Sequence, residues 1–473
     1  MRMSCRTPPF LALAALVFAA AFCTAVIGQQ APTPQPQPNR LPPVGPARPN
    51  RGSVVPKPAD AMPTVPAGFT VTEFAAGIQA PRMMVFAPNG DLFVSSPAAN
   101  NITLFRDANK DGVYEHRSVY VQGEVAARRG GGGGNAGQAG ARAGGAPPAP
   151  AAPPAAPAIN PEVNGPILGA SAPACVEPMP FANRGPGTIQ APFGLAFNDG
   201  YLYVGNTGSL VRFKYTAGDL TAQGEAEKLL DLPVGGHSTR NIVFNRAGTK
   251  MYLAVGSQSN NNAGEDCRRA AVLEFNPDGT GYRVYASGLR NPVGLTLQPG
   301  TDIVWTTVNE RDNLGDDLVP DYATSLRAGG FYGWPYSYIG SNYDPRYQGA
   351  AADLVRRAIV PDVLFPSHSA ALGINFYTGT AFPQRYRNGG FVALHGSWNR
   401  SVNTGAKVVF FPMNNGRPGP AEDFLTGFVT ADGSGGTPIQ RYGRPVGVAV
   451  APDGSLLVSD DGGNRIWQIK VGR

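Results

Sequence analysis

Six segments of the chain repeat one pattern of apolar and polar positions. Each segment has an apolar run with period-two alternation, then a turn, then a second apolar run. Period-two alternation is typical of β-strands, and Pro-Asn-Gly or Pro-Asp-Gly turns join two such strands into a hairpin. The six predicted hairpins cover residues 84–94, 193–204, 242–253, 293–305, 374–394 and 446–458.

Six hairpin units at this spacing predict an all-β protein with the architecture of a six-bladed β-propeller. No long amphipathic helical pattern competes with the strands. A last strand over residues 465–469 is expected to pair with residues 69–74, which would close the ring and remove free sheet edges. An array of β-sandwiches is the alternative architecture.

The first 28 residues predict a secretory signal peptide. Arg2 and Arg6 precede an apolar run from Phe10 to Ile27, and small residues stand before Gln29. This order is typical of an export signal, so we expect a periplasmic or secreted protein. Retention of the segment as an uncleaved anchor is the alternative.

Composition marks two further segments that do not resemble core material. Residues 29–65 are rich in Pro, Gln and Ala, and we expect a linker because they cannot bury enough apolar surface. Residues 127–160 consist mainly of Gly, Ala and Pro, which predicts a low-complexity insertion in a surface loop. The catalytic propeller is therefore expected over residues 66–473.

Charge and cysteine content limit the partners. The net charge of +6 is spread along the chain without interleaved aromatic residues, so nucleic acid is not an expected partner. After the signal no segment is long and apolar enough to span a membrane. Cys175 and Cys267 either form a disulfide or remain separate thiols. No Cys-x-x-Cys-His haem motif occurs, so an electron carrier would be a separate protein, such as a cytochrome c.

Polar residues stand just before several of the predicted first strands. Because each occupies the same point of its own repeat, a propeller would bring them together around one axis. Guanidinium groups bind carboxylates in a bidentate manner and stack on flat rings, so these arginines suit a flat ligand with several carboxylates. The residues are Gln190, His237 with Arg240, Arg290 with Asn291, and Arg441 with Arg444.

The strongest candidate for a general base is His237. It precedes a first strand, lies three residues before Arg240, and carries the side chain best suited to accept a proton near neutral pH. His368 and His395 are weaker alternatives for this role.

Two loops contain oxygen ligands of the kind that calcium prefers. The better candidate is the loop over residues 309–317, in which we expect Asp312 and Asn313 to hold the ion. The stretch from Asp107 to Gly112 is similar to the start of a calcium loop, but Ser118 stands at the twelfth position. A plain hairpin turn is the alternative for that stretch.

Three motifs in order carry a resemblance to a known family. Gly288-Leu289-Arg290-Asn291-Pro292-Val293-Gly294 is followed by the oxygen-rich loop and then by Gly329-Gly330-Phe331-Tyr332-Gly333-Trp334-Pro335. This order resembles the soluble quinoprotein sugar dehydrogenases, the glucose/sorbosone dehydrogenase family that uses pyrroloquinoline quinone. The resemblance covers most of residues 185–465 and is stronger toward the sorbosone and fungal pyranose dehydrogenase branches.

The resemblance implies roles for individual residues. His237 matches the general base, Arg290 and Asn291 match the cofactor-facing pair, and Gln190, Arg240, Arg441 and Arg444 match cofactor-binding positions. Arg290, or else Arg240, would stabilise the oxyanion on the reduced cofactor. The family's cofactor-binding lysine has no clear counterpart, and Arg400 or Lys407 lies in that region. The family also has an aspartate before its histidine, where this chain has Gly236.

The function implied is oxidation of an aldose or sugar-derived aldehyde, of the sorbosone type, to a lactone or acid. Hydride transfer to pyrroloquinoline quinone with Ca²⁺ as Lewis acid would carry the reaction. A calcium-dependent lactonase or esterase and a non-catalytic binding propeller are the alternatives, because one fold hosts several functions.

Overall fold

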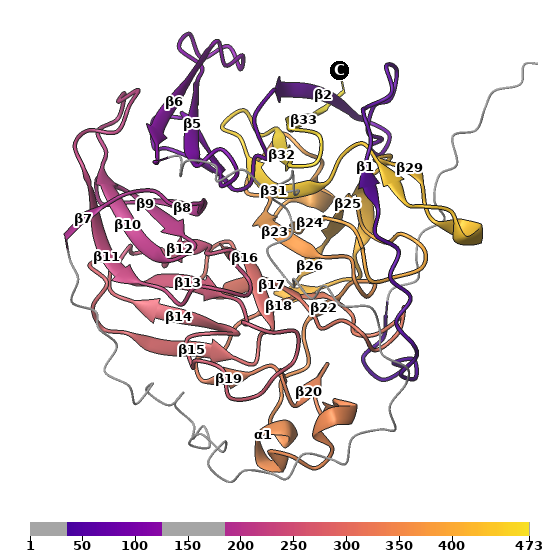
Figure 1. The fold of residues 1–473 in the computed structure, drawn as a ribbon. Coiled ribbons are helices and arrows are strands. Elements are labelled where there is room, and N and C mark those ends of the chain that lie inside the picture. The colour runs from indigo at the N-terminus through magenta and orange to yellow at the C-terminus, as the bar shows by residue number, and fades with distance from the viewer. Residues whose placement is uncertain (1–35, 125–184, 473) are drawn as a thin grey trace, which may run out of the picture. The chain divides into compact units, whose positions relative to one another are not determined.

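Six sheets of four or five strands, each built on one of the predicted hairpins, make up most of the described chain (Figure 1). The structure is a computed structural model and describes residues 36–124 and 185–472, which belong to one unit spanning 33–473. The predicted signal peptide (1–28) and insertion (127–160) lie outside the described residues.

The sheets follow one another along the chain. The first three contain β3 (Met84–Phe86), β4 (Leu92–Ser96), β5 (Asn101–Arg106) and β6 (His116–Gln122); β7 (Gly185–Gly187), β8 (Pro192–Asn198), β9 (Tyr201–Asn206), β10 (Ser209–Lys214) and β11 (Ala226–Asp231); and β12 (Ile242–Phe244), β13 (Met251–Val255), β14 (Ala271–Phe275), β15 (Arg283–Ser287) and β19 (Gly330–Phe331). The last three contain β16 (Asn291–Leu297), β17 (Val304–Asn309), β18 (Tyr322–Ser325) and β22 (Val363–Leu364); β23 (Ala371–Phe376), β24 (Gly390–Leu394), β25 (Lys407–Phe411) and β28 (Glu422–Leu425); and β31 (Pro445–Val450), β32 (Leu456–Asp460), β33 (Arg465–Val471) and β2 (Phe69–Ala76).

Smaller elements connect these sheets. They are β1 (Ser53–Val54), β29 (Val429–Ala431) and β30 (Gln440–Arg441) in one sheet; β20 (Ser337–Tyr338) with β21 (Asn342–Tyr343); β26 (Met413–Asn414) with β27 (Arg417–Pro418); the helix α1 (Ala352–Arg356); and the 3₁₀ turns Pro345–Tyr347, Gln384–Tyr386 and Ser434–Gly436. The prediction of an all-β protein is confirmed.

All six predicted hairpins form as antiparallel strand pairs. Their local sequences explain this outcome, since apolar side chains alternate and the turn residues suit the bend. Gly90 and Gly454 end the Pro-Asn-Gly and Pro-Asp-Gly turns with φ of +94° and +80°, a conformation that favours glycine. The pairs are β3 with β4, β8 with β9, β12 with β13, β16 with β17, β23 with β24, and β31 with β32.

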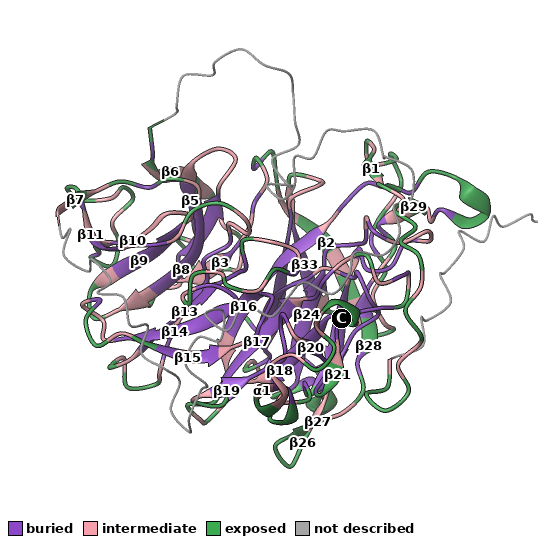
Figure 2. Ribbon diagram, turned by 60° about the horizontal axis from the view of Figure 1, so that its bottom comes forward, coloured by how far each residue is buried: buried purple, intermediate pink, exposed green. Residues whose placement is uncertain are grey.

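The first strands of the six sheets contact one another in succession. Strand β3 contacts β8, β8 contacts β12, and the series continues through β16, β23 and β31 back to β3. All six line one cavity of about 310 Å³, to which they contribute Val85, Leu195, Val243, Leu295, Ile374 and Val448. The second strands β13 and β24 are buried along their whole length (Figure 2).

The predicted closing pair is confirmed. Strand β33 lies antiparallel to β2, with Ile469 opposite Val71 and Trp467 opposite Glu73, and it continues the sheet of β31 and β32. Strand β2 therefore shares one sheet with the last strand of the described chain. Pairing of this kind covers an edge that would otherwise be free.

The described part of the predicted linker differs from the expectation drawn from composition. Within residues 36–65, strand β1 pairs in parallel with β30, and Thr64 bridges Thr426. The side chains of Val55, Ala61 and Val65 pack against a core cluster of the last two sheets. A segment too poor in apolar residues to fold alone can still dock on a body that is already folded.

Two further expectations concern the membrane and the cysteines. In the described ranges, no helix has both the length and the apolar character needed to cross a bilayer. Cys267 is disulfide-bonded, and Cys175 lies outside the described residues.

Candidate functional site

The loops before the first strands contact residues that follow second strands. The carbonyl of Arg290, just before β16, accepts a hydrogen bond of 2.7 Å from the N–H of Ser257, which follows β13. In the same way, Arg444 lies before β31 and donates to the carbonyls of His395 and Gly396, which follow β24. These contacts between sheets assemble two clusters of charged and polar side chains.

His237 lies at the centre of the first cluster. Its Nδ1 atom is 2.8 Å from the carbonyl oxygen of Ser257, so Nδ1 carries the proton and Nε2 keeps its lone pair. Burial, and then the positive charge of Arg290, lowers the pKa of His237 to about 3. The imidazole is therefore neutral at physiological pH, although the residue is only partly buried.

Gly236 explains why no carboxylate orients this histidine from the preceding position. Its φ is +61°, and an added Cβ would lie 2.3 Å from the backbone of Gln258. A side chain therefore does not fit at this point of the loop. The carbonyl of Ser257 takes over the task of orienting the ring.

Arg290 braces the loop that follows β17. Its Nη1 donates to the carbonyl of Glu310 at 2.6 Å, and its Nε and Nη2 donate to Asn260 at 3.0 Å each. A salt bridge of 3.5 Å joins Nη2 to Asp312. Most of the guanidinium's hydrogen bonds are therefore made within the protein, and its charge lies beside His237.

Asn291 and His237 approach each other over Gly256. An added Cβ at Gly256 would lie 2.2 Å from the Oδ1 atom of Asn291 and 2.6 Å from the Cβ of His237. The Oδ1 atom of Asn291 is buried and has no hydrogen-bond partner in the described structure. A buried, unpaired amide oxygen of this kind calls for a partner that a ligand could supply.

The two predicted metal residues have different surroundings. Asp312 faces Arg290 on one side and His368 on the other, with 3.3 Å between its Oδ1 and the Nδ1 of His368. Burial alone would raise the pKa of Asp312, but the hydrogen bond from His368 and the charge of Arg290 outweigh it and hold the pKa below its usual range. Asn313 instead lies at an exposed turn with φ of +74°.

A different loop brings carboxylates together. In the part of the chain that the structure describes, the ligand atoms of Asp107, Asp111 and Glu115 lie within 4.8 Å of one another. This is the loop between β5 and β6, whose first residues are similar to the start of a calcium loop. No comparable group forms within residues 309–317.

Arg240 is fully buried and braces the loop of His237. Its Nη1 donates to the carbonyls of His237 and Thr239 at 2.8 Å each, and its Nη2 donates to Pro233 at 2.7 Å. Burial, followed by the charge of Arg269, lowers the pKa of Arg240 to about 9. The structure thus gives this guanidinium backbone partners on the protein itself.

The second cluster contains Arg441, Arg444 and His395. Arg441 donates from Nη2 to the carbonyl of Ser397 at 2.8 Å, while its Nη1 is buried without a partner in the described structure. Burial, followed by the charge of Arg444, lowers the pKa of Arg441 to about 9. Burial also lowers the pKa of Arg444.

Two members of this cluster are absent from the sequence predictions. Asp461 binds the Nε2 of His395 at 2.7 Å and the Nη1 of Arg82 at 2.6 Å. Arg82 stands before β3, the position already singled out in the other repeats, so positional agreement could have identified it. Asp461 follows a second strand, and only the contact between sheets reveals its role.

The sequence also predicts Gln190 and Arg400 as site residues. Gln190 is exposed, and its N–H donates to Asn206 at 3.0 Å. Arg400 donates to the carbonyl of Asp316 and forms a salt bridge of 2.8 Å with Asp317. Arg400 thus joins the loop after β24 to the loop after β17.

Two buried guanidinium groups, one in each cluster, form no salt bridge with a described residue. They belong to Arg240 and Arg441, which are at most 2 % exposed. Arg444 is partly buried, and Asp461 and Asp460 lie near its charge. A buried cation without an anion is costly. The two clusters are therefore suited to a ligand that carries carboxylates.

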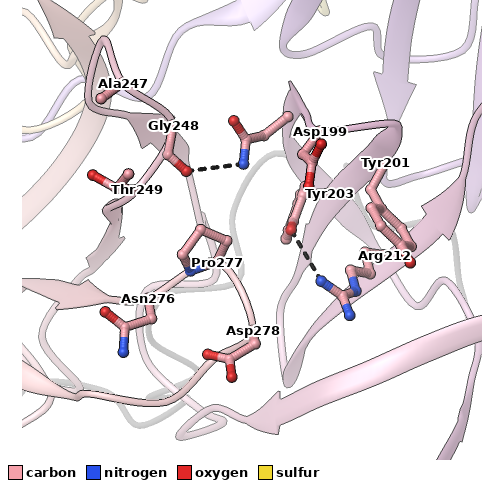
Figure 3. A pocket seen from close by; sticks show the side chains of 11 residues that line it. Asp199, Tyr201, Tyr203, Arg212, Ala247, Gly248, Thr249, Asn276, Pro277 and Asp278 are labelled. Atoms are coloured by element: carbon pink, nitrogen blue, oxygen red, sulfur yellow. Dashed lines mark hydrogen bonds between the residues drawn. The ribbon is translucent and has the colours of Figure 1, made fainter.

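Another cavity, of about 700 Å³, lies elsewhere (Figure 3). It is lined by turns of the second and third sheets, such as that of Asp278, and by Tyr201 and Tyr203 of strand β9. Its polar groups bind one another, since Arg212 donates to the hydroxyl of Tyr203 and Asn198 donates to the carbonyl of Gly248. None of the predicted site residues lines it.

Comparison with known proteins identifies sequence relatives. Residues 205–397 match the family model described as Glucose / Sorbosone dehydrogenase, and residues 345–472 match the model described as TrAA12-like. An uncharacterized protein of Borreliella burgdorferi is 29% identical over 298 residues, 60% of this chain and 76% of that protein. A pyrroloquinoline quinone-dependent pyranose dehydrogenase of Coprinopsis cinerea is 28% identical over 295 residues, 50% of this chain and 39% of that protein.

A solved structure extends the likeness over most of the chain. The holo form of the pyranose dehydrogenase PQQ domain from Coprinopsis cinerea aligns with a TM-score of 0.62 and 20% identity, over 88% of this chain and 98% of that one. At this level of identity, the alignment indicates a shared fold.

Proposed function

The chain resembles the glucose/sorbosone dehydrogenase family, as its sequence predicts, and on that premise we propose that it is a quinoprotein sugar dehydrogenase. We propose a six-bladed β-propeller that carries the site at the loops before its first strands. The single observation that carries the proposal is that each of the two clusters contains a buried guanidinium group without a salt bridge to a described residue, Arg240 in one and Arg441 in the other, and that the cluster of Arg240 also contains the neutral imidazole of His237.

The donors fit pyrroloquinoline quinone, a flat molecule with three carboxylates. Arg441 and Arg444 would bind its carboxylates, and the unpaired amide oxygen of Asn291 offers an acceptor. Arg290 supplies positive charge beside His237, whereas Arg240 would act through the His237 loop, and Gln190 and Arg400 would have to turn toward the ligand. When bound, this cofactor supplies the two-electron oxidant that the protein's own side chains lack.

His237 would remove the proton of the substrate hydroxyl. Its Nε2 atom has the free lone pair because Nδ1 donates to Ser257. The adjacent charge of Arg290 disfavours imidazolium and favours any anion that develops at the site. The substrate class is an aldose or a sugar-derived aldehyde of the sorbosone type, and its product a lactone or acid.

Calcium remains part of the proposal because residues 309–317 contain oxygen ligands of the kind that this ion prefers. Asp312 is paired with Arg290 and His368, and Asn313 lies at an exposed turn, so we assign no step of the reaction to the ion. Electrons would leave to a separate acceptor such as a cytochrome c. The charged start, apolar run and small residues of 1–28 support export to the periplasm or outside the cell.

Reconstitution tests this function directly. Purified protein is mixed with pyrroloquinoline quinone and CaCl₂, binding is followed by absorbance, and dye reduction is followed with a panel of aldoses and aldehydes. We expect saturable cofactor binding and sugar-dependent dye reduction. Absence of cofactor binding would rule out the proposed function. Cofactor binding without sugar oxidation would support the proposed cofactor but rule out the proposed substrate class.

A further inference from the structure

The described part of residues 36–65 crosses three loops of the proposed site. The N–H of Gly45 donates to Leu314 at 2.9 Å, next to the predicted metal residues. The side chain of Asn50 donates to the carbonyls of Ser401 and Thr437 at 3.0 Å each. This segment therefore binds the loop after β17, the loop that contains Arg400, and the loop that leads to Arg441.

The segment also contacts Arg441 itself. The N–H of Ser53 donates to Ile439 and that of Val55 donates to Arg441, both at 2.9 Å. An added Cβ at Gly52 would lie 2.2 Å from the Nη2 atom of Arg441. Gly52 does not have a positive φ, so the backbone conformation does not require glycine there. Glycine is required there because the Arg441 guanidinium occupies the space that a side chain would need.

A second glycine faces the other end of the same guanidinium. An added Cβ at Gly396 would lie 2.2 Å from the Nη1 atom of Arg441. The guanidinium thus lies between the backbones of Gly52 and Gly396, with Nη2 bound to Ser397 and Nη1 unpaired in the described structure. Its position is fixed from both sides, and one donor is left for a ligand.

We propose that residues 45–55 form part of the proposed cofactor site, with Gly52 as a positioning residue that leaves room for the Arg441 guanidinium. This inference rests on the proposed function, because Arg441 is a cofactor-binding residue only within it. The ligand recognised is a carboxylate-bearing anion. The segment would contribute to its binding without touching it, by holding Arg441 and the two neighbouring loops.

Gly52→Ala tests the inference because the added Cβ would fall beside the Arg441 guanidinium and the Cγ2 atom of Ile439. The atoms that a Cβ would meet are mainly the end of a flexible side chain, which can move without unfolding the protein. We expect the Kd for pyrroloquinoline quinone to rise about ten- to a hundredfold, the loss of one charged hydrogen bond, at an unchanged melting temperature. Gly185→Ala is the matched control, since its Cβ would meet nothing within 4 Å.

A double-mutant cycle separates positioning from a general structural effect. Cofactor binding is titrated by absorbance in Gly52→Ala, Arg441→Ala and the double variant. If Gly52 acts through Arg441, the double variant binds no more weakly than Arg441→Ala. Wild-type affinity in Gly52→Ala, or additive losses, would overturn the inference while the proposed function stands. A wild-type protein that does not bind the cofactor would overturn the proposed function and the inference with it.

Discussion

The Nδ1 atom of His237 lies 2.8 Å from the carbonyl oxygen of Ser257, and this contact fixes which nitrogen of the ring is basic. Ser257 is in turn bound through its N–H to the carbonyl of Arg290. The tautomer of His237 is therefore set by the same backbone that presents Arg290. This relationship leads to the first prediction.

His237→Ala should reduce turnover about 10²–10⁴-fold, the usual contribution of a general base. Cofactor affinity should stay close to wild type because the arginines bind the carboxylates. Steady-state kinetics and an absorbance titration measure the two quantities. Normal turnover would shift the role to His395 or His368, and lost cofactor binding would make His237 a ligand or a structural residue.

The pH dependence of turnover should lack a histidine step. The pKa of His237 is lowered to about 3, so the imidazole is neutral throughout the range from pH 5 to pH 8. An unperturbed histidine would instead produce a rise with a midpoint at about pH 6.5. The pH profile of kcat/KM in the reconstituted enzyme distinguishes a lowered pKa of His237 from an unperturbed one. A rise of unit slope through pH ~6.5 would show that the pKa of His237 is not lowered.

Stability should fall as the pH is lowered below about 6.5, the ordinary pKa of an unfolded histidine. Burial lowers the folded-state pKa of His395 to about 3, although Asp461 opposes this shift. Between pH 3 and pH ~6.5, His395 therefore binds a proton more readily in the unfolded chain than in the folded one. His395→Gln should lose less stability than wild type between pH 7 and pH 5 in urea denaturation.

Arg82→Ala should destabilise the protein by about 3–5 kcal/mol, because it removes a partner of the buried carboxylate of Asp461. Arg385→Ala is the control, since its salt bridge with Glu422 is exposed and should contribute about 0–1 kcal/mol. Urea denaturation of both variants gives the comparison. Equal losses of unfolding free energy would mean that the salt bridge between Arg82 and Asp461 stabilises the protein no more than an exposed salt bridge does.

Chelation tests the calcium part of the proposal and separates the two loops. Removal of divalent ions with EDTA should abolish dye reduction, and added CaCl₂ should restore it. Asp312→Asn should weaken that restoration, whereas Asp111→Asn should not, because the group of Asp107, Asp111 and Glu115 lies in the loop between β5 and β6. The reverse result would place the functional ion at the β5–β6 loop.

The sequence by itself determined the strands and their local pairing. Alternation of apolar residues and the turns at Gly90 and Gly454 depend on neighbouring positions, so the six hairpins could be predicted without any tertiary information. The pairing of β2 with β33 could also be predicted, because the ring expected from the six repeats leaves few partners for the last strand. The positions just before the first strands likewise pointed to His237, Arg290 and Arg441.

Tertiary structure alone decided how these side chains are used. Arg240 precedes a first strand as Arg290 does, yet backbone carbonyls surround it and it braces a loop. The pairing of Asp461 with Arg82 joins residues from opposite ends of the chain, which no local pattern encodes. The proline-rich segment around Gly52 is ordered by hydrogen bonds to loops that are already folded, a source of stability that composition does not report. Local sequence sets backbone conformation, whereas burial and charge at each site arise from contacts between distant segments.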